Sequence, residues 1–103
     1  MLTSKQRAKL KSIGANIEAL YQMGKNEPDE NYIIQLSAAL DAKEIIKIKV
    51  LETAAYTPKE AAEILAERTD SEVVQVIGSK IILYRKSRKK DKTDISKIIE
   101  IIK

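Results

Sequence analysis

The chain has 103 residues, the length of one small domain, and 33% of them are charged. It contains neither cysteine nor histidine, which excludes disulfides, thiolate metal sites, the commonest metal ligand and the commonest general base. The net charge of +4 is unevenly spread. Residues 1–25 carry five basic and one acidic side chains, and residues 76–103 carry nine basic and three acidic ones. Residues 26–75, between them, carry five basic and eleven acidic side chains. Two basic ends around an acidic middle favour a polyanionic partner, with ordinary surface charge as the alternative.

The N-terminal segment predicts a helix over residues 4–16. Thr3 and Gln6 stand at the spacing of a capping box. Apolar residues then recur at helical spacing, and they are Leu10, Ile13 and Ile17. Basic residues flank this stripe as like-charged pairs four positions apart, namely Lys5 with Lys9 and Arg7 with Lys11. A bound phosphate would relieve their repulsion, and solvation by water is an equally good interpretation.

A short apolar segment, residues 19–23, predicts a strand that ends at Gly24. The loop Gly24-Lys25-Asn26-Glu27-Pro28 follows, and Asp29 is the expected N-cap of a second helix that ends near Lys43. A glycine between a strand and a helix N-terminus lets the backbone approach an anion closely. Gly24, Lys25 and Asn26 are therefore candidate ligand contacts, although many strand–helix loops share this composition.

Residues 46–50 alternate between apolar residues and lysine, which predicts a half-buried strand. Its lysines, Lys47 and Lys49, face either water or a ligand. Thr57-Pro58-Lys59-Glu60 starts a third helix, and residues 72–77 and 80–85 are strands joined by a tight hairpin. The expected order is α-β-α-β-α-β-β, in which two strand–helix–strand units give right-handed parallel crossovers and the hairpin adds an antiparallel strand.

The character of the sequence changes after this hairpin. A basic run without apolar residues follows, and it consists of Arg85, Lys86, Arg88, Lys89, Lys90 and Lys92. This run is expected to be mobile and to act either as an arm that attracts phosphates or as a solubilising tail. A segment with Ile95, Ile98, Ile99 and Ile102 at helical spacing follows, although isoleucine also favours strands. About ten residues are too few for an isolated helix to persist in water. The segment is predicted to dock on its own domain, with pairing of two copies as the alternative.

Patterns that indicate catalysis are missing from the sequence. No nucleophile stands beside a partner base, no loop has the phosphate-cradling pattern of nucleotide hydrolases, and no residues have metal-ligand spacing. The chain is expected to be no enzyme and to need no metal or other cofactor. Because no apolar run reaches the length of a signal sequence or a membrane span, a cytoplasmic location is expected.

The order of these residues resembles the CRM domain (chloroplast RNA splicing and ribosome maturation) in its stand-alone bacterial YhbY-like form. The resemblance covers residues 2–86 and rests on residues 2–12, 22–26, 44–51, 62–69, 74–78 and 82–85. It implies a two-layer α/β domain with a mixed four-stranded sheet, similar to the C-terminal domain of translation initiation factor three. It also implies RNA binding, since bacterial members are associated with precursor large ribosomal subunits and plant members with intron splicing.

The family loop, Gly-Lys-Asn-Gly, is compared with the RNA-clamping loop of KH domains. Gly24, Lys25 and Asn26 match it, whereas Glu27 stands at the fourth position. Glutamate places a side chain and a negative charge where a phosphate would pass. We therefore expect part of the RNA binding to shift to other basic residues, namely Lys5, Arg7, Lys9, Lys11, Arg85, Lys86 and Arg88.

The sequence thus predicts an RNA-binding domain over residues 1–86, followed by a basic linker and an Ile-rich segment over residues 87–103. The expected function is the binding of structured ribosomal RNA in precursor large subunits, mainly through phosphates, during ribosome assembly. The alternative is a protein-interaction module that docks through the Ile-rich C-terminal segment. No membrane or small-molecule substrate is expected as a partner. A monomer is expected, with a dimer through the C-terminal segment as the alternative.

Overall fold

The protein is built on a mixed four-stranded sheet. A computed structural model of the chain describes residues 2–102. Its strands β1 (Tyr21–Met23), β2 (Ile45–Val50), β4 (Lys80–Tyr84) and β3 (Glu72–Ile77) lie in the order β1-β2-β4-β3. β1 is parallel to β2, and β4 is antiparallel to both of its neighbours. The mixed sheet and the order of elements predicted from the sequence are confirmed.

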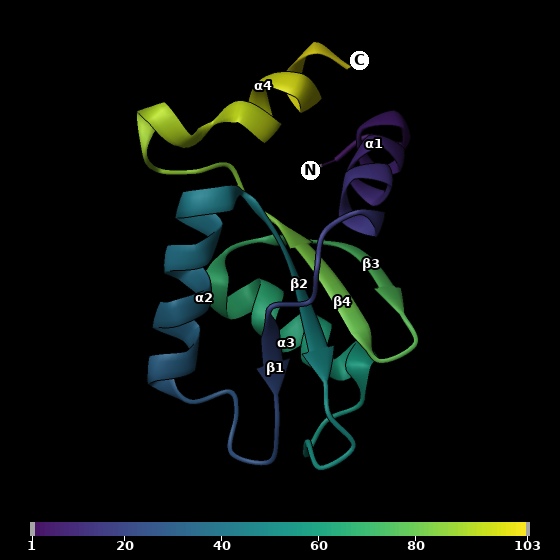
Figure 1. Cartoon of the computed structure of the whole chain (residues 1–103), viewed down its shortest axis with the longest axis vertical. Helices are drawn as coiled ribbons and strands as arrows, with labels where there is room; N and C mark the ends of the chain where they lie inside the picture. The colour runs from purple at the N-terminus through teal and green to yellow at the C-terminus, as the bar shows by residue number, and fades with distance from the viewer. Residues whose placement is uncertain (1, 103) are drawn as a thin grey trace.

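Two helices cover one face of this sheet. α2 (Glu30–Lys43) connects β1 to β2, α3 (Pro58–Thr69) connects β2 to β3, and both lie on the same side of the strands (Figure 1). Ile46, Ile48 and Val50 of β2 are buried in the core beneath these helices. Because successive side chains of a strand point to opposite faces, Lys47 and Lys49 lie on the other face of the sheet.

The helices begin at the capping residues that the sequence predicts. Thr57 caps α3, whose first residue is Pro58, and Thr3 caps α1 (Ser4–Ala15), in both cases through a reciprocal capping box. The side chain of Asp29 caps α2 by accepting a hydrogen bond from a backbone N–H in its first turn. α2 ends at Lys43, and its C-cap is Glu44, which has the left-handed φ of 66°.

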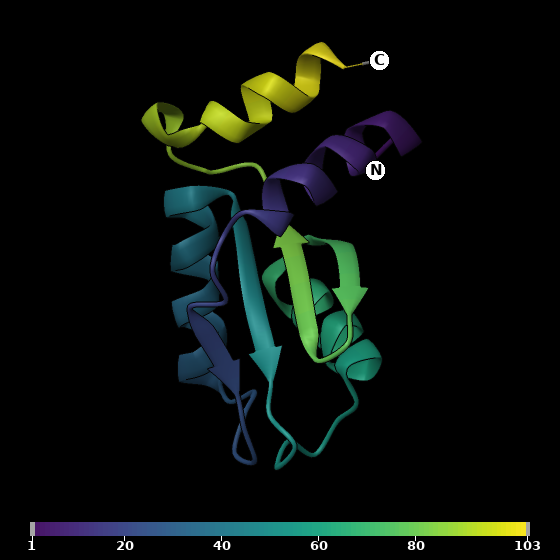
Figure 2. The same ribbon diagram turned by 45° about the vertical axis from the view of Figure 1, so that its right-hand side comes forward.

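The second face of the sheet is covered at one end only. α1 packs there against β2, β3 and β4, and α4 (Asp94–Ile101) packs against α1 and the end of the sheet at Tyr84, as Figure 2 shows. They bury a second apolar cluster that includes Leu10, Ile82 and Ile99. α1 approaches the sheet closely at Gly14, where a Cβ would lie 2.7 Å from Cδ1 of Ile82. The C-terminal segment is therefore a helix, and the prediction that it docks on its own domain is confirmed.

The basic run between β4 and α4 is fixed to the domain, so the expectation that it is mobile is wrong. The buried carboxylate of Glu44 accepts hydrogen bonds from the N–H of Ser87 (2.8 Å), the N–H of Ser96 (2.9 Å) and the hydroxyl of Ser96. A short 3-10 helix, Lys90–Lys92, lies between these two anchor points. A buried carboxylate needs donors, and this segment supplies them.

Candidate functional site

The end of the sheet that α1 and α4 leave uncovered carries a row of exposed side chains across all four strands. Strand register places Gln22 beside Lys49, Lys49 opposite Lys80, and Lys80 opposite Ile77. All four residues are exposed, Ile77 by 50%. We call this row, together with Lys47, the open sheet face. Every charged side chain in this set is a lysine.

Lys49 and Lys80 give the open sheet face its chemistry. Directly opposite residues on one face of an antiparallel pair have their Cβ atoms roughly 4.5–5.5 Å apart, and two like charges in that arrangement destabilise the sheet. Lys47 lies on the same face, two residues from Lys49 along β2, and adds a third positive charge. An anion bound between these ammonium groups would replace repulsion by attraction. A phosphate is suited to this place because each lysine presents three N–H donors.

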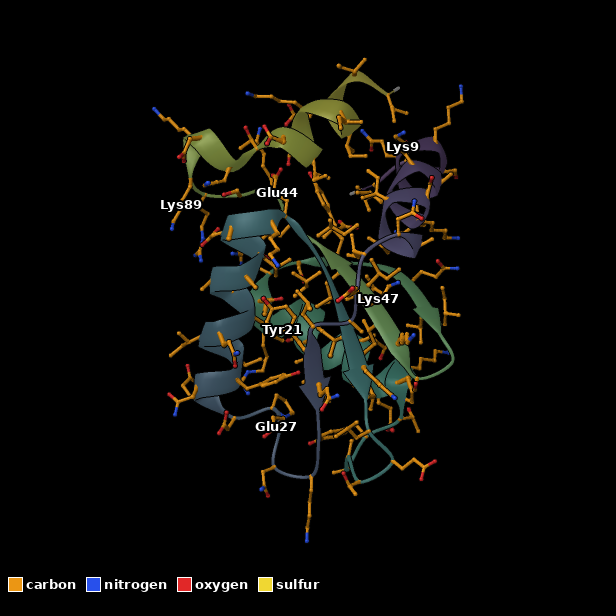
Figure 3. All side chains as sticks on the ribbon, viewed as in Figure 1. Lys9, Tyr21, Glu27, Glu44, Lys47 and Lys89 are labelled. Atoms are coloured by element: carbon orange, nitrogen blue, oxygen red, sulfur yellow. The ribbon has the colours of Figure 1, made fainter. Side chains whose placement is uncertain are left out.

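The lysines predicted on α1 lie towards the other end of the same face. Lys5, Lys9 and Lys11 are exposed, and Lys9 projects from α1 in Figure 3. Arg7 differs from them, because its guanidinium donates hydrogen bonds to the carbonyl groups of Val73 and Val74 in β3. Arg7 therefore holds α1 against the sheet, whereas the three lysines are directed to solvent.

The loop after β1 is a tight turn closed by the side chain of Glu27. Its carboxylate accepts a hydrogen bond from the N–H of Gly24 (2.8 Å), and the N–H of Glu27 donates to the carbonyl of Gly24 (3.3 Å). Lys25 and Asn26 are exposed in this loop, which follows β1 at the end of the sheet where Gln22 lies beside Lys49. The carboxylate of Glu27 thus accepts the hydrogen bond of the Gly24 N–H group, which a phosphate bound at Gly24 would need. The side chain of Lys25 can still contact a phosphate.

Glu27 also acts on the core beneath the loop. The hydroxyl of Tyr32 is buried without a hydrogen-bond partner among the described residues. Burial, and next the negative charge of Glu27, raise the pKa of Tyr32 well above its usual range. Tyr32 is therefore a neutral core residue at physiological pH.

The three basic residues predicted after β4 lie in ion pairs of the protein itself. Arg85 is 11% exposed, and its guanidinium lies 2.9 Å from the carboxylate of Asp41. Arg88 donates to both oxygens of the same carboxylate, from Nε to Oδ1 and from Nη2 to Oδ2. Hydrogen bonds from Arg88 and Arg85 hold the pKa of Asp41 well below its usual range, although burial opposes them. Lys86 pairs with Glu100 at 2.6 Å. These residues fasten the C-terminal segment to α2 and α4.

The structure therefore divides the predicted site residues into two groups. One group is exposed at the two ends of the same sheet face and consists of Lys5, Lys9, Lys11, Lys25 and Asn26. The other group makes contacts within the protein and consists of Arg7, Gly24, Arg85, Lys86 and Arg88. The sequence did not single out Lys80, and it left Lys47 and Lys49 open between solvent and ligand. Only the register of β2 against β4 shows that Lys49 and Lys80 face each other.

Residues 2–102 offer neither a metal site nor a membrane span. In this part of the chain, no group of three or more acidic side chains could hold a metal ion. None of the described helices is both long and apolar enough to cross a bilayer.

Similarity to known proteins points to one family. The family model for the CRS1 / YhbY (CRM) domain matches residues 2–85. The "Probable RNA-binding protein YqeI" of Bacillus subtilis is 35% identical over 92% of this chain and 99% of its own length. The "Probable RNA-binding protein MJ0652" of Methanocaldococcus jannaschii is 36% identical over 97% of this chain and 83% of its own length. The solution structure of a hypothetical Staphylococcus aureus protein, SAV1595, which is proposed to bind RNA, superposes with a TM-score of 0.73 at 46% identity, over 87% of this chain and 94% of that one.

Proposed function

Because the chain belongs to the CRS1 / YhbY (CRM) domain family, we propose that it binds RNA across the open sheet face and the exposed lysines of α1. The observation that carries this proposal is the pairing of Lys49 with Lys80 on exposed, neighbouring strands. A sheet that places two lysines opposite each other gains stability when an anion binds between them. The names of the relatives support RNA as the source of that anion.

We further propose that the RNA is ribosomal RNA of precursor large subunits, bound during ribosome assembly. The family resemblance supports this partner. The open sheet face crosses all four strands, so it suits structured RNA that displays phosphates and 2′-hydroxyl groups. The lysines Lys9 on α1 and Lys25 in the loop extend the same basic surface beyond the sheet at its two ends.

The alternative function is protein docking through the Ile-rich C-terminal segment, but most of the isoleucines in this segment are covered by the protein itself. Ile99 is buried, and Ile95 and Ile102 pack against the second apolar cluster within the protein. Ile98 (43% exposed) and Ile101 (79% exposed) remain at the surface. Two partly exposed isoleucines give a much smaller apolar area than the whole stripe would, so the RNA function is the one we adopt.

Salt dependence of RNA binding tests the proposal. If about four phosphates of single-stranded RNA are neutralised, the log–log slope of affinity against salt concentration is near −3. Lys49→Ala and Lys80→Ala should each weaken binding and reduce the magnitude of the slope by about 0.7. Lys59→Ala, which removes an exposed lysine of α3 on the helical side of the sheet, is the matched control and should leave the slope unchanged. A wild-type slope of zero would contradict phosphate binding.

The identity of the RNA needs a separate experiment. Crosslinking in cells, followed by sequencing of the attached RNA, should yield reads concentrated in large-subunit ribosomal RNA and its precursors. The Lys49→Ala/Lys80→Ala double variant, expressed at the same level, should lose these reads. Reads spread over messenger RNA without ribosomal enrichment would contradict the ribosomal partner while leaving RNA binding itself intact.

A further inference from the structure

A small apolar hollow borders the open sheet face. It has a volume of about 260 Å³ and lies between the end of α1, the strands β1 and β2, and the first turn of α4. Ile17, Leu20, Tyr21 and Ile95 are among the side chains that line it. Leu20 is 59% exposed at this place, immediately before β1. An exposed leucine beside an apolar hollow is unfavourable in water, so a ligand that covers it would stabilise the protein.

The rim of the hollow is charged in a way that limits what can enter. Lys43 and Lys47 lie on the rim, and Lys47 is also part of the open sheet face (Figure 3). Glu18 lies on the rim as well, and its carboxylate repels a phosphate or an acidic side chain that would enter the hollow. Phosphates are therefore favoured outside it, against the two lysines, and an uncharged group is favoured inside.

The size and the aromatic wall fit one flat ring. The hollow lies just below the roughly 300–1,000 Å³ of pockets that hold drug-sized ligands, so it takes a single ring system. Tyr21, on the edge strand and next to the exposed Leu20, lines the hollow from the helical side of the sheet, where its half-buried side chain packs against the core beneath α2 and α3. Proteins that read single-stranded RNA hold unstacked bases against such side chains.

We propose that this hollow is a nucleobase pocket that takes one unpaired base of the bound RNA, against Tyr21 and Leu20, while Lys43 and Lys47 hold the adjacent phosphates. The inference rests on the proposed function, because the strand that enters the pocket is the one whose phosphates lie on the open sheet face. It adds a contact to a base where the lysines supply only contacts to phosphates, and base contacts are the source of sequence preference. An apolar side chain of a protein partner is the competing occupant.

Abasic RNA tests this pocket separately from phosphate binding. A single-stranded ribosomal RNA fragment that binds the full chain is synthesised with one base removed at a time, and each affinity is measured by fluorescence anisotropy. Removal of one particular base should weaken binding by about 5- to 100-fold, the loss typical of a base stacked on an aromatic side chain. The salt slope should stay unchanged at that position, because every phosphate is retained.

Two matched variants complete the test. Leu20→Ser should weaken binding of the intact RNA, and removal of the critical base should then cost little more. Ile34→Ser is the control, because Ile34 is 58% exposed on α2, on the helical side of the sheet, and it should behave as the wild type. Salt-dependent binding without any sensitive base position would overturn the pocket and leave the proposed function standing. The pocket is overturned in the same way if Leu20→Ser leaves the loss from the abasic site undiminished. Absence of RNA binding in the wild type would overturn both.

Discussion

Glu44 is expected to hold the C-terminal segment on the domain, and the substitution Glu44→Gln tests this role. The residue is 1% exposed at the end of α2. Its carboxylate joins the segment after β4 to α4 through the backbone N–H groups of Ser87 and Ser96. Glutamine has nearly the same shape, so the change alters the hydrogen-bonding chemistry and leaves the packing volume almost constant.

The size of the effect follows from the geometry. The two N–H groups donate to different oxygens of the carboxylate, at 2.9 Å to Oε1 and 2.8 Å to Oε2. In glutamine one of these oxygens becomes an NH₂ group, so one buried N–H loses its acceptor. A hydrogen bond to a charged group contributes roughly 1.5–3 kcal/mol, so we expect the free energy of unfolding to fall by about 2 kcal/mol. For a domain of this length, that corresponds to a decrease in Tm of about 10 °C.

Thermal melting followed by circular dichroism measures this decrease. Glu63→Gln is the matched control, because it changes an exposed carboxylate of α3 and should alter stability by less than about 0.5 kcal/mol. Amide hydrogen exchange adds a local measurement, since the N–H groups of Ser87 and Ser96 should lose protection more than those of the sheet. If Glu44→Gln melts at the wild-type temperature, the carboxylate does not hold this segment and the reasoning is refuted.

Three further predictions concern the packing of α1, the acidic partner of the arginines, and the loop. Gly14→Ala should destabilise the protein by about 1–3 kcal/mol in urea denaturation although alanine favours helices, because its Cβ meets Ile82, and adding Ile82→Val should recover part of the loss. Asp41 has a depressed pKa when folded, so its contribution to stability is present above its unfolded pKa of about 3.9 and is lost as pH falls further. The loss caused by Asp41→Asn should therefore be larger at pH 7 than at pH 2, and an equal loss at both would contradict this. Lys25→Ala should weaken RNA binding, whereas Glu27→Gly should strengthen it by freeing the N–H group that the carboxylate occupies; titrations that show the opposite order would contradict the loop geometry.

Most of the fold could be predicted from local sequence patterns. The capping residues Thr3, Asp29 and Thr57 begin their helices as the sequence predicts, because a cap involves only neighbours within one turn. The alternation around Lys47 and Lys49 likewise fixes which residues of β2 enter the core.

The roles of several site residues depend on contacts between distant parts of the chain. Arg85 stands in a basic run, and no local pattern indicates that its guanidinium pairs with Asp41 on α2. The sequence around Glu44 indicates only the end of a helix. Its hydrogen bond from Ser96 joins residues that are 52 positions apart, so no local pattern predicts it. In the sequence, Lys80 is only a polar residue after a turn. The register of the sheet shows that it lies opposite Lys49.

Charge reversal at Lys49 tests the central claim most directly, because its two effects have opposite signs. A glutamate at this position faces Lys80, and an opposite-charge pair across two strands contributes roughly 0.2–1 kcal/mol, so Lys49→Glu should raise the free energy of unfolding. The same change should weaken RNA binding at least about tenfold, since a hydrogen bond between a charged group and its partner contributes roughly 1.5–3 kcal/mol.

The measurement is the RNA affinity of wild type, Lys49→Glu and Lys59→Glu in one buffer, with urea denaturation of each in parallel. Lys59→Glu changes the net charge equally but lies on α3, on the helical side of the sheet, and should cost much less affinity. We predict that Lys49→Glu, unlike Lys59→Glu, is both more stable than the wild type and weaker in RNA binding. Equal losses of affinity in both variants, or no loss in either, would contradict an RNA-binding role for the open sheet face.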